Sequence, residues 1–176
     1  PVPIKCVGVW DTVGNIGNPF DSGGFIGRYV SFHDTRLSPS VEVGLHALSI
    51  DELRGPFRPT FWTMPKGGAV PAGQTVEQVW FAGCHADVGG GYAETCLSDI
   101  SLNWMAERVA ALTGLGIDFE LLRSTTRPDP LGPQHSSTTS GIFKLSNKMP
   151  CIRLIRQQLG GVPPLRRALV GTWRTS

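Results

Sequence analysis

The chain has 176 residues, of which 40% are hydrophobic and 17% charged, and its formal net charge is +2. These values are ordinary for one globular domain with its own core. No apolar run approaches the roughly 20 residues that a membrane-spanning helix requires. The small net charge and the absence of interleaved exposed aromatics argue against a nucleic-acid partner. We interpret the basic residues near the end as a solvated or subunit-facing tail: Arg153, Arg156, Arg166, Arg167 and Arg174.

Neither the start of the chain nor its cysteines indicate a cellular compartment. The chain begins at Pro1 without a methionine, so we expect a piece of a longer protein, and localisation stays open. The four cysteines show no C-x-x-C spacing, which argues against a zinc ribbon or a redox pair. Cys6 and Cys84 lie in or beside expected core strands and are interpreted as small buried hydrophobes.

The first half of the chain predicts two strands and a helix. Residues 4–10 form a short apolar run that reads as a buried strand. Residues 14–40 are a long excursion rich in Gly, Ser, Asn and Pro, either an apolar lid or ordinary loop packing. Residues 41–53 carry apolar side chains near helical spacing and predict a helix. Residues 57–64 are a second strand candidate, interrupted by Pro59.

The second half opens with the clearest signals. Residues 75–83 predict a strand, and residues 99–112 predict a helix with Ser98 as N-cap and Gly114 as its stop. The apolar stripe of this helix consists of Leu102, Met105, Val109 and Leu112. Residues 124–150 are rich in Pro, Ser, Thr and Gly and predict loop with a short strand near 141–145. Residues 151–170 predict an interrupted final helix.

This order of elements predicts an α/β fold with a largely parallel sheet, in a single domain over residues 1–176. Ligands of such sheets bind at the carboxyl ends of the strands. Two expected strand ends carry ionisable groups, Asp11 after 4–10 and His85 after 75–83. A carboxylate and an imidazole there can form the acid–base half of a hydrolytic triad, and Asp before His is the order found in α/β-hydrolases.

A nucleophile for this pair is missing. No G-x-S-x-G pentapeptide occurs in the 176 residues. The nearest serine–glycine cluster, Ser22 to Gly24, follows Asp11 and has no preceding strand, so we reject it as the nucleophile elbow. Cys84 adjoins His85, but successive side chains of a strand point to opposite faces, which argues against that pair.

Each candidate also has a structural interpretation. Asp11 could be a turn-forming residue and His85 a satisfied core histidine. Asp87 could cap a turn or bind a cation. The glycines 89–91 lack the Lys-Ser/Thr of a P-loop, so we interpret them as a sharp turn that keeps the site open. His135 lies in a loop without an evident partner.

One cluster of potential metal ligands occurs in the sequence. His46, Asp51 and Glu52 lie close in sequence, but polar packing of a predicted helix is the favoured interpretation, with His46 structural. We therefore expect neither a bound metal nor a cofactor. A cation or phosphoester site built from Asp11, Asp87 and the glycine loop remains a further alternative.

Four motifs in order resemble one family, the uncharacterised α/β-hydrolase domain family that includes phospholipase effectors of bacterial type VI secretion. The motifs are VWDTVG (9–14), HALSIDE (46–52) with Arg54, Phe57, Pro59 and Trp62 after it, VWFAGCHADVGGGY (79–92) and LSDISLNWM (97–105). The resemblance is strongest over residues 4–112, and residues 124–176 are less diagnostic.

The resemblance implies a serine-dependent hydrolase of ester bonds, of phospholipase or lipase type, with the chain as the carboxyl-terminal portion of an α/β-hydrolase-like fold. Asp11 would be the triad acid and His85 the general base, with the serine elbow upstream of Pro1. It also implies a lipid or other ester substrate, contact with a membrane surface, a secretion-system or immunity-protein partner, and a bacterial secreted effector. The alternative is a non-catalytic module that uses a hydrolase fold for binding or structure.

Overall fold

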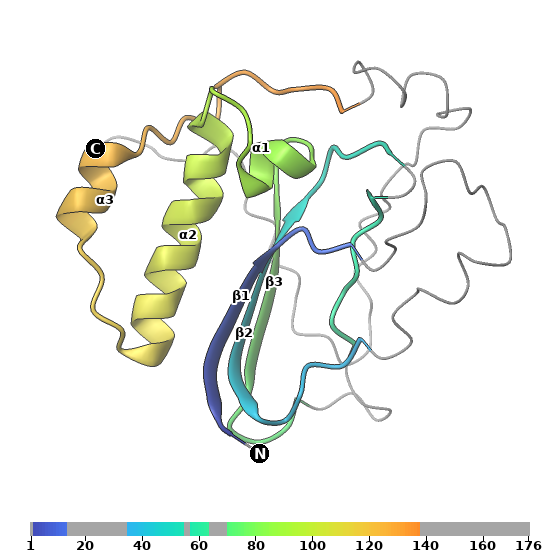
Figure 1. Ribbon diagram of the computed structural model, residues 1–176, viewed down its shortest axis with the longest axis vertical. Helices are drawn as coiled ribbons and strands as arrows, with labels where there is room; N and C mark the ends of the chain where they lie inside the picture. The colour runs from blue at the N-terminus through green and yellow to red at the C-terminus, as the bar shows by residue number, and fades with distance from the viewer. Residues whose placement is uncertain (1, 14–34, 55–56, 64–69, 138–176) are drawn as a thin grey trace, which may run out of the picture.

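The computed structural model describes residues 2–13, 35–54, 57–63 and 70–137. Its centre is a parallel three-stranded sheet in the order β1-β2-β3, formed by β1 (Ile4–Trp10), β2 (Val41–Ser49) and β3 (Thr75–Phe81). Trp10 pairs with Ala47, and Ala47 pairs with Val79, so the carboxyl ends of all three strands meet at one edge. The predicted parallel α/β arrangement and the strand predicted at 4–10 are confirmed, and so is the strand predicted at 75–83, which ends at Phe81 (Figure 1).

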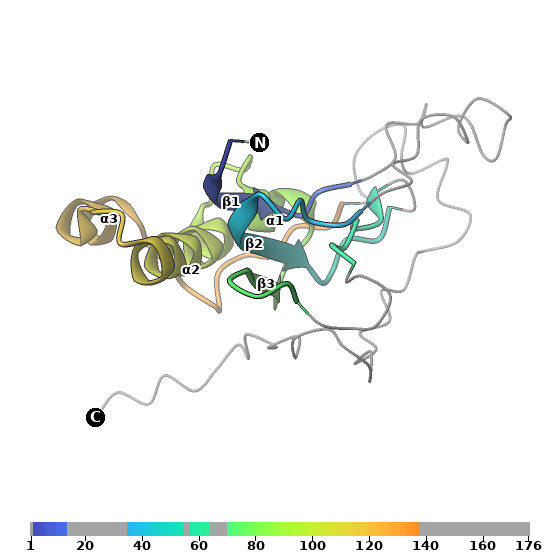
Figure 2. The ribbon, with the colours of Figure 1, turned by 90° about the horizontal axis from the view of Figure 1, so that it is seen from below.

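The described residues form three helices beside the sheet: α1 (His85–Gly89), α2 (Cys96–Thr113) and α3 (Phe119–Thr125). In Figure 1, α1 lies at the carboxyl edge of the strands, and α2 runs alongside the sheet. Figure 2 shows α2 against one face of the sheet, with α3 outside it, and the segments 50–54 and 57–63 on the opposite side. None of the helices in the described ranges is both long and apolar enough to cross a membrane.

The prediction of a helix over 41–53 is wrong, because this segment forms the central strand β2. Eight of its nine residues are buried, since α2 covers one face and the segment around Trp62 covers the other. A strand buried on both faces shows no alternation of apolar and polar residues, so its pattern can match helical spacing by chance. The β-branched Val41 and Val43 were the local signal for a strand.

The strand candidate at 57–64 is also wrong for the residues that the structure describes there. Residues 57–63 make one isolated bridge, between Pro59 and Val13. The segment instead covers the second face of the sheet, where Phe61 packs edge-on against Trp80 at 5.6 Å between ring centroids. Trp62 lies against His46 on the same face at 5.3 Å.

The main core lies between the sheet and α2. Val43, Leu45, Ala47, Val79 and Phe81 point from the strands toward buried Met105, and partly buried Trp104, Val109 and Leu112 pack around them. β1 approaches the helix closely at Gly8, where an added Cβ would lie 2.8 Å from the Met105 sulfur. Trp10 at the end of β1 donates from its indole nitrogen to Ser101 Oγ of α2, at 3.1 Å.

The helix predicted over 99–112 is confirmed but begins earlier. α2 starts at Cys96 with Thr95 as N-cap, and Ser98 lies in the first turn. Gly114 ends it in a left-handed conformation with φ 73°, as expected of a C-terminal glycine. Leu102 is 40% exposed and does not belong to the buried stripe. The short helix α3, which buries no residue, was not predicted.

Several sequence predictions fall outside the described residues. They concern the excursion over 14–40 (apart from 35–40), the Ser22–Gly24 cluster, the strand near 141–145 and the helix over 151–170. The basic residues of the tail lie there as well.

Candidate functional site

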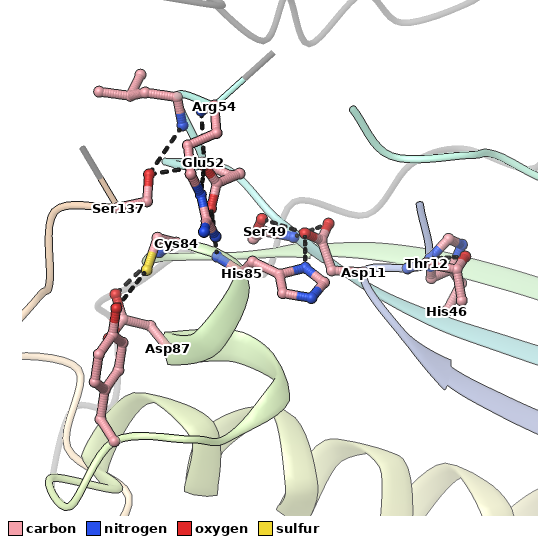
Figure 3. A network of polar contacts seen from close by, with 12 residues as sticks. Asp11, Thr12, His46, Ser49, Glu52, Arg54, Cys84, His85, Asp87 and Ser137 are labelled. Carbon is pink, nitrogen blue, oxygen red and sulfur yellow. Dashed lines mark hydrogen bonds and ion pairs between the residues drawn. The ribbon is translucent and has the colours of Figure 1, made fainter. Parts of the chain in front are cut away.

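The carboxyl edge of the sheet holds the candidate site, which Figure 3 shows from close by. Asp11 follows the last residue of β1 directly. His85 follows β3 after a short turn and is the first residue of α1. Because β2 lies between these two strands, its end supplies the neighbouring group, Ser49. The structure thus brings the two sequence-predicted site residues to one point.

Asp11 and His85 are hydrogen-bonded to each other. The Asp11 carboxylate is fully buried, and its Oδ2 lies 2.8 Å from Nδ1 of His85. A carboxylate accepts, so Nδ1 carries the hydrogen and donates. Ser49 donates twice, from its backbone amide to Oδ1 at 2.9 Å and from its hydroxyl to Oδ2 at 2.7 Å. Asp11 is therefore held in one orientation.

The backbone at Asp11 is strained. Its φ is 38°, and no other non-glycine residue among those described has a positive φ. Such a conformation is costly for a residue with a side chain, and strain of this kind clusters at functional sites. The conformation turns the chain sharply at the end of β1, while the Asp11 amide still donates to the carbonyl of Ala47 at 2.6 Å.

The His85 ring is held on one side and open on the other. Its side chain is 32% exposed. The ring packs against Phe57 in a T-shaped contact, with 5.2 Å between the ring centroids and 66° between the ring planes. None of the residues in the described ranges makes a hydrogen bond to Nε2. With Nδ1 donating to Asp11, the neutral ring presents a lone pair at Nε2, the arrangement of a general base.

Glu52, which the sequence indicated only as part of a polar cluster, is a buried acid. Its carboxylate is 0% exposed and accepts five hydrogen bonds, three of them from Arg54. The others come from Ser137 Oγ at 2.7 Å and the His85 amide at 3.3 Å. Burial alone would raise the pKa of Glu52, but the bonds from Arg54 and Ser137 outweigh it and hold that pKa below its ordinary value.

Asp87 caps the start of α1. Its Oδ2 accepts from the backbone amide of Cys84 at 2.9 Å, so the capping role is the one the structure displays. The same carboxylate binds His135, whose Nδ1 lies 2.7 Å from Oδ1 and whose amide lies 3.1 Å from Oδ2. His135, which had no evident partner in the sequence, also stacks on Tyr92 with 3.7 Å between ring centroids.

Glycines shape the turns on both sides of α1. Gly83 has φ 102°, and a Cβ there would lie 2.4 Å from the Cβ of Asp87. Gly90 and Gly91 have φ 84° and 141°, and Gly89 is the last residue of α1 rather than part of a loop. Only glycine adopts these conformations without strain, which agrees with the sharp turn expected from the sequence.

His46 is structural, although it lies on β2 rather than on a helix. It is fully buried, and its Nε2 accepts from the Thr12 amide at 3.2 Å. Its Nδ1 lies 3.4 Å from Oε1 of Gln78. Burial lowers the pKa of His46 to about 4, against weaker opposing effects of Gln78 and Asp11. A neutral His46 thus holds the backbone of Thr12, immediately after Asp11.

The other polar neighbours bind separate partners. Asp51 Oδ2 accepts from the Gly83 amide at 2.8 Å, so Asp51, His46 and Glu52 do not converge. Cys84 Sγ lies 3.6 Å from the Tyr92 hydroxyl, and burial raises the pKa of this thiol. Across the described part of the chain, no three His, Cys, Asp or Glu side chains form a group that could hold a metal ion.

Comparison with known proteins identifies the family of the chain. Comparisons with curated proteins and with solved structures give no match. One family model, described as T6SS, Phospholipase effector Tle1-like, catalytic domain, matches residues 1–108. This span covers all three strands, Asp11, His85 and most of α2. The chain therefore belongs to the family of Tle1-like catalytic domains of type VI secretion phospholipase effectors.

Proposed function

We propose that this chain is the acid–base portion of a serine-dependent phospholipase with an α/β-hydrolase-like fold. The observation that carries the proposal is the Asp11–His85 pair at the carboxyl edge of a parallel sheet, with Nδ1 of His85 directed at a buried carboxylate. The order of acid and histidine along the chain is that of α/β-hydrolases. The phospholipid substrate is proposed from the effector family.

In this mechanism Nε2 of His85 takes the proton of a serine hydroxyl as its oxygen attacks the ester carbonyl of the lipid. Asp11 holds the tautomer and stabilises the imidazolium that forms. The tetrahedral intermediate then collapses, and His85 gives the proton to the departing lysophospholipid alcohol. A water molecule releases the fatty acid from the serine by the same steps. Residues 1–176 contain no G-x-S-x-G elbow, so we assign the serine to sequence upstream of Pro1.

The test is hydrolysis of phospholipid vesicles by the protein encoded by the complete gene. We expect His85→Ala to lower kcat by about 10⁴-fold or more, because loss of a triad member removes the activation of the nucleophile. Leu121→Ala, a truncation of similar size at an exposed position of α3, should leave kcat unchanged. Activity of His85→Ala within a few-fold of wild type would contradict the proposal.

A chelator separates this mechanism from the cation alternative. The proposed proton transfers use only Asp11, His85 and serine, so EDTA should leave hydrolysis unchanged. Activity that EDTA abolishes and one divalent ion restores would favour a cation site near Asp11 and Asp87 instead.

A further inference from the structure

Two buried carboxylates outside the Asp11–His85 pair hold the backbone at the start of α1. Glu52 accepts from the amide of His85 at 3.3 Å, and Asp87 accepts from the amide of Cys84 at 2.9 Å. Both residues are buried, at 0% and 3% exposure. Figure 3 shows the two acids on either side of the Cys84–His85 backbone. Neither carboxylate bonds to the imidazole, so they act on the main chain that carries it.

One short segment after α3 binds both of these acids. Ser137 Oγ donates to Glu52 Oε1 at 2.7 Å. His135 donates to Asp87 from both its Nδ1, at 2.7 Å, and its amide, at 3.1 Å. The contact between Ser137 and Glu52 spans 85 positions of the chain, and the contact between His135 and Asp87 spans 48. Residues 135–137 therefore bridge the two acids across the start of α1.

The start of α1 needs such support. The helix has five residues, too few to be stable without tertiary contacts. A buried carboxylate that loses a donor becomes costly, and its remaining hydrogen bonds rearrange. Removing Ser137 or His135 would thus shift an acid that bonds directly to the Cys84–His85 backbone.

His135 itself is placed as an anchor rather than as a second base. Its Nδ1 is engaged by Asp87, and its Nε2 lies 3.6 Å from a carboxylate oxygen of Glu94. The stacked Tyr92 ring covers one face of the imidazole. Both ring nitrogens thus face carboxylates of the chain.

We propose that Ser137 and His135 are positioning residues, which fix the backbone of His85 through Glu52 and Asp87 and so keep Nε2 in place for proton transfer. The inference rests on the proposed function, because it assigns the two residues to the same reaction. A displacement of about 1 Å at a reacting group can lower a rate by about a hundredfold. Neither residue touches the reacting atoms.

The experiment measures kcat and KM of the complete protein on phospholipid vesicles for Ser137→Ala, Ser137→Thr and His135→Asn. We expect Ser137→Ala and His135→Asn each to lower kcat about ten- to a hundredfold at unchanged KM. Ser137→Thr keeps the hydroxyl and should restore most of the activity. Ser124→Ala, an exposed serine on α3, serves as the matched control. Wild-type kcat in both Ser137→Ala and His135→Asn would overturn the proposal.

A double variant distinguishes positioning from general destabilisation. If Ser137 acts through His85, Ser137→Ala should cost nothing further in the His85→Ala background. An equal loss of activity in both backgrounds would overturn the positioning role.

Hydrogen exchange separates this inference from the proposed function. We expect faster exchange of the His85 amide in Ser137→Ala, because its acceptor Glu52 has lost a donor, and unchanged exchange there would contradict the anchoring. If His85→Ala itself remains fully active, the proposed function fails, and the exchange result still decides whether the anchor exists.

Discussion

Protonation of His46 should destabilise this domain at mildly acidic pH. The imidazole is fully buried on β2, where it accepts from the Thr12 amide through Nε2. Burial lowers its pKa from the ordinary 6.5 to about 4 in the folded state. In the unfolded chain it should titrate near 6.5. The unfolded state therefore binds the proton first as the pH falls, and stability is lost between pH 6.5 and 4.

The size of this effect follows from the two pKa values. They differ by about 2.5 pKa units, and each unit is worth about 1.4 kcal/mol. His46 alone should therefore remove about 3 kcal/mol of unfolding free energy between pH 7 and 4, a large part of the stability of an ordinary domain. Above pH 7 its contribution should not change with pH.

Urea unfolding followed by tryptophan fluorescence at several pH values measures this loss. His46→Gln is the matched variant, since an amide can accept from Thr12 and donate to Gln78 but does not titrate. The carboxylates titrate in both proteins, so the difference between the two pH curves isolates His46. Parallel curves for wild type and His46→Gln from pH 7 to 4 would refute the assignment of a buried, neutral His46.

Three further outcomes follow from the packing around the site. Gly83→Ala should destabilise the domain by about 1–3 kcal/mol in urea unfolding, because φ is 102° and the new Cβ would lie 2.4 Å from that of Asp87. Unchanged stability would contradict this conformation of the turn before α1. At Gly44 of β2 an added Cβ would lie 2.5 Å from Leu37 Cδ2 and 3.1 Å from the Trp62 ring. Gly44→Ala should therefore cost about 1–3 kcal/mol by overpacking the second face of the sheet, whereas a neutral effect would mean that this face is loosely filled. Alkaline titration at 295 nm should show Tyr92 ionising near pH 12, since its hydrogen bond with Cys84 and burial raise its pKa to about 12. Tyr92→Phe should remove that titration step. A single step near pH 10 in the wild type would contradict the Tyr92–Cys84 contact.

The edge of the sheet was predictable from the sequence because its signals are local. Residues 4–10 and 75–83 are apolar runs followed by turns, and parallel strands bring their carboxyl ends together. The juxtaposition of Asp11 and His85 follows from that rule alone. The central strand β2 was missed because burial on both faces removes the alternation that identifies a strand.

The support around His85 could not be read from the sequence. Ser137 meets Glu52 from 85 positions away, and His135 meets Asp87 from 48 positions away. No periodicity or short motif encodes such pairs, since they depend on where the chain after α3 returns. Glu52 and Arg54 carried one local signal, their spacing of two residues, but the full burial of Glu52 appears only in the fold.

The most direct test of the Asp11–His85 pair is the kcat of Asp11→Asn in the complete protein, measured on phospholipid vesicles. The asparagine side chain is nearly isosteric with aspartate but lacks the negative charge that stabilises the His85 imidazolium. Its amide group also favours the wrong tautomer of His85. We expect kcat to fall about 10⁴-fold, the loss that this change causes in a serine protease triad. Asp118→Asn, the cap of α3, should leave kcat unchanged. A folded Asp11→Asn protein with kcat within tenfold of wild type would contradict the role of Asp11 as triad acid.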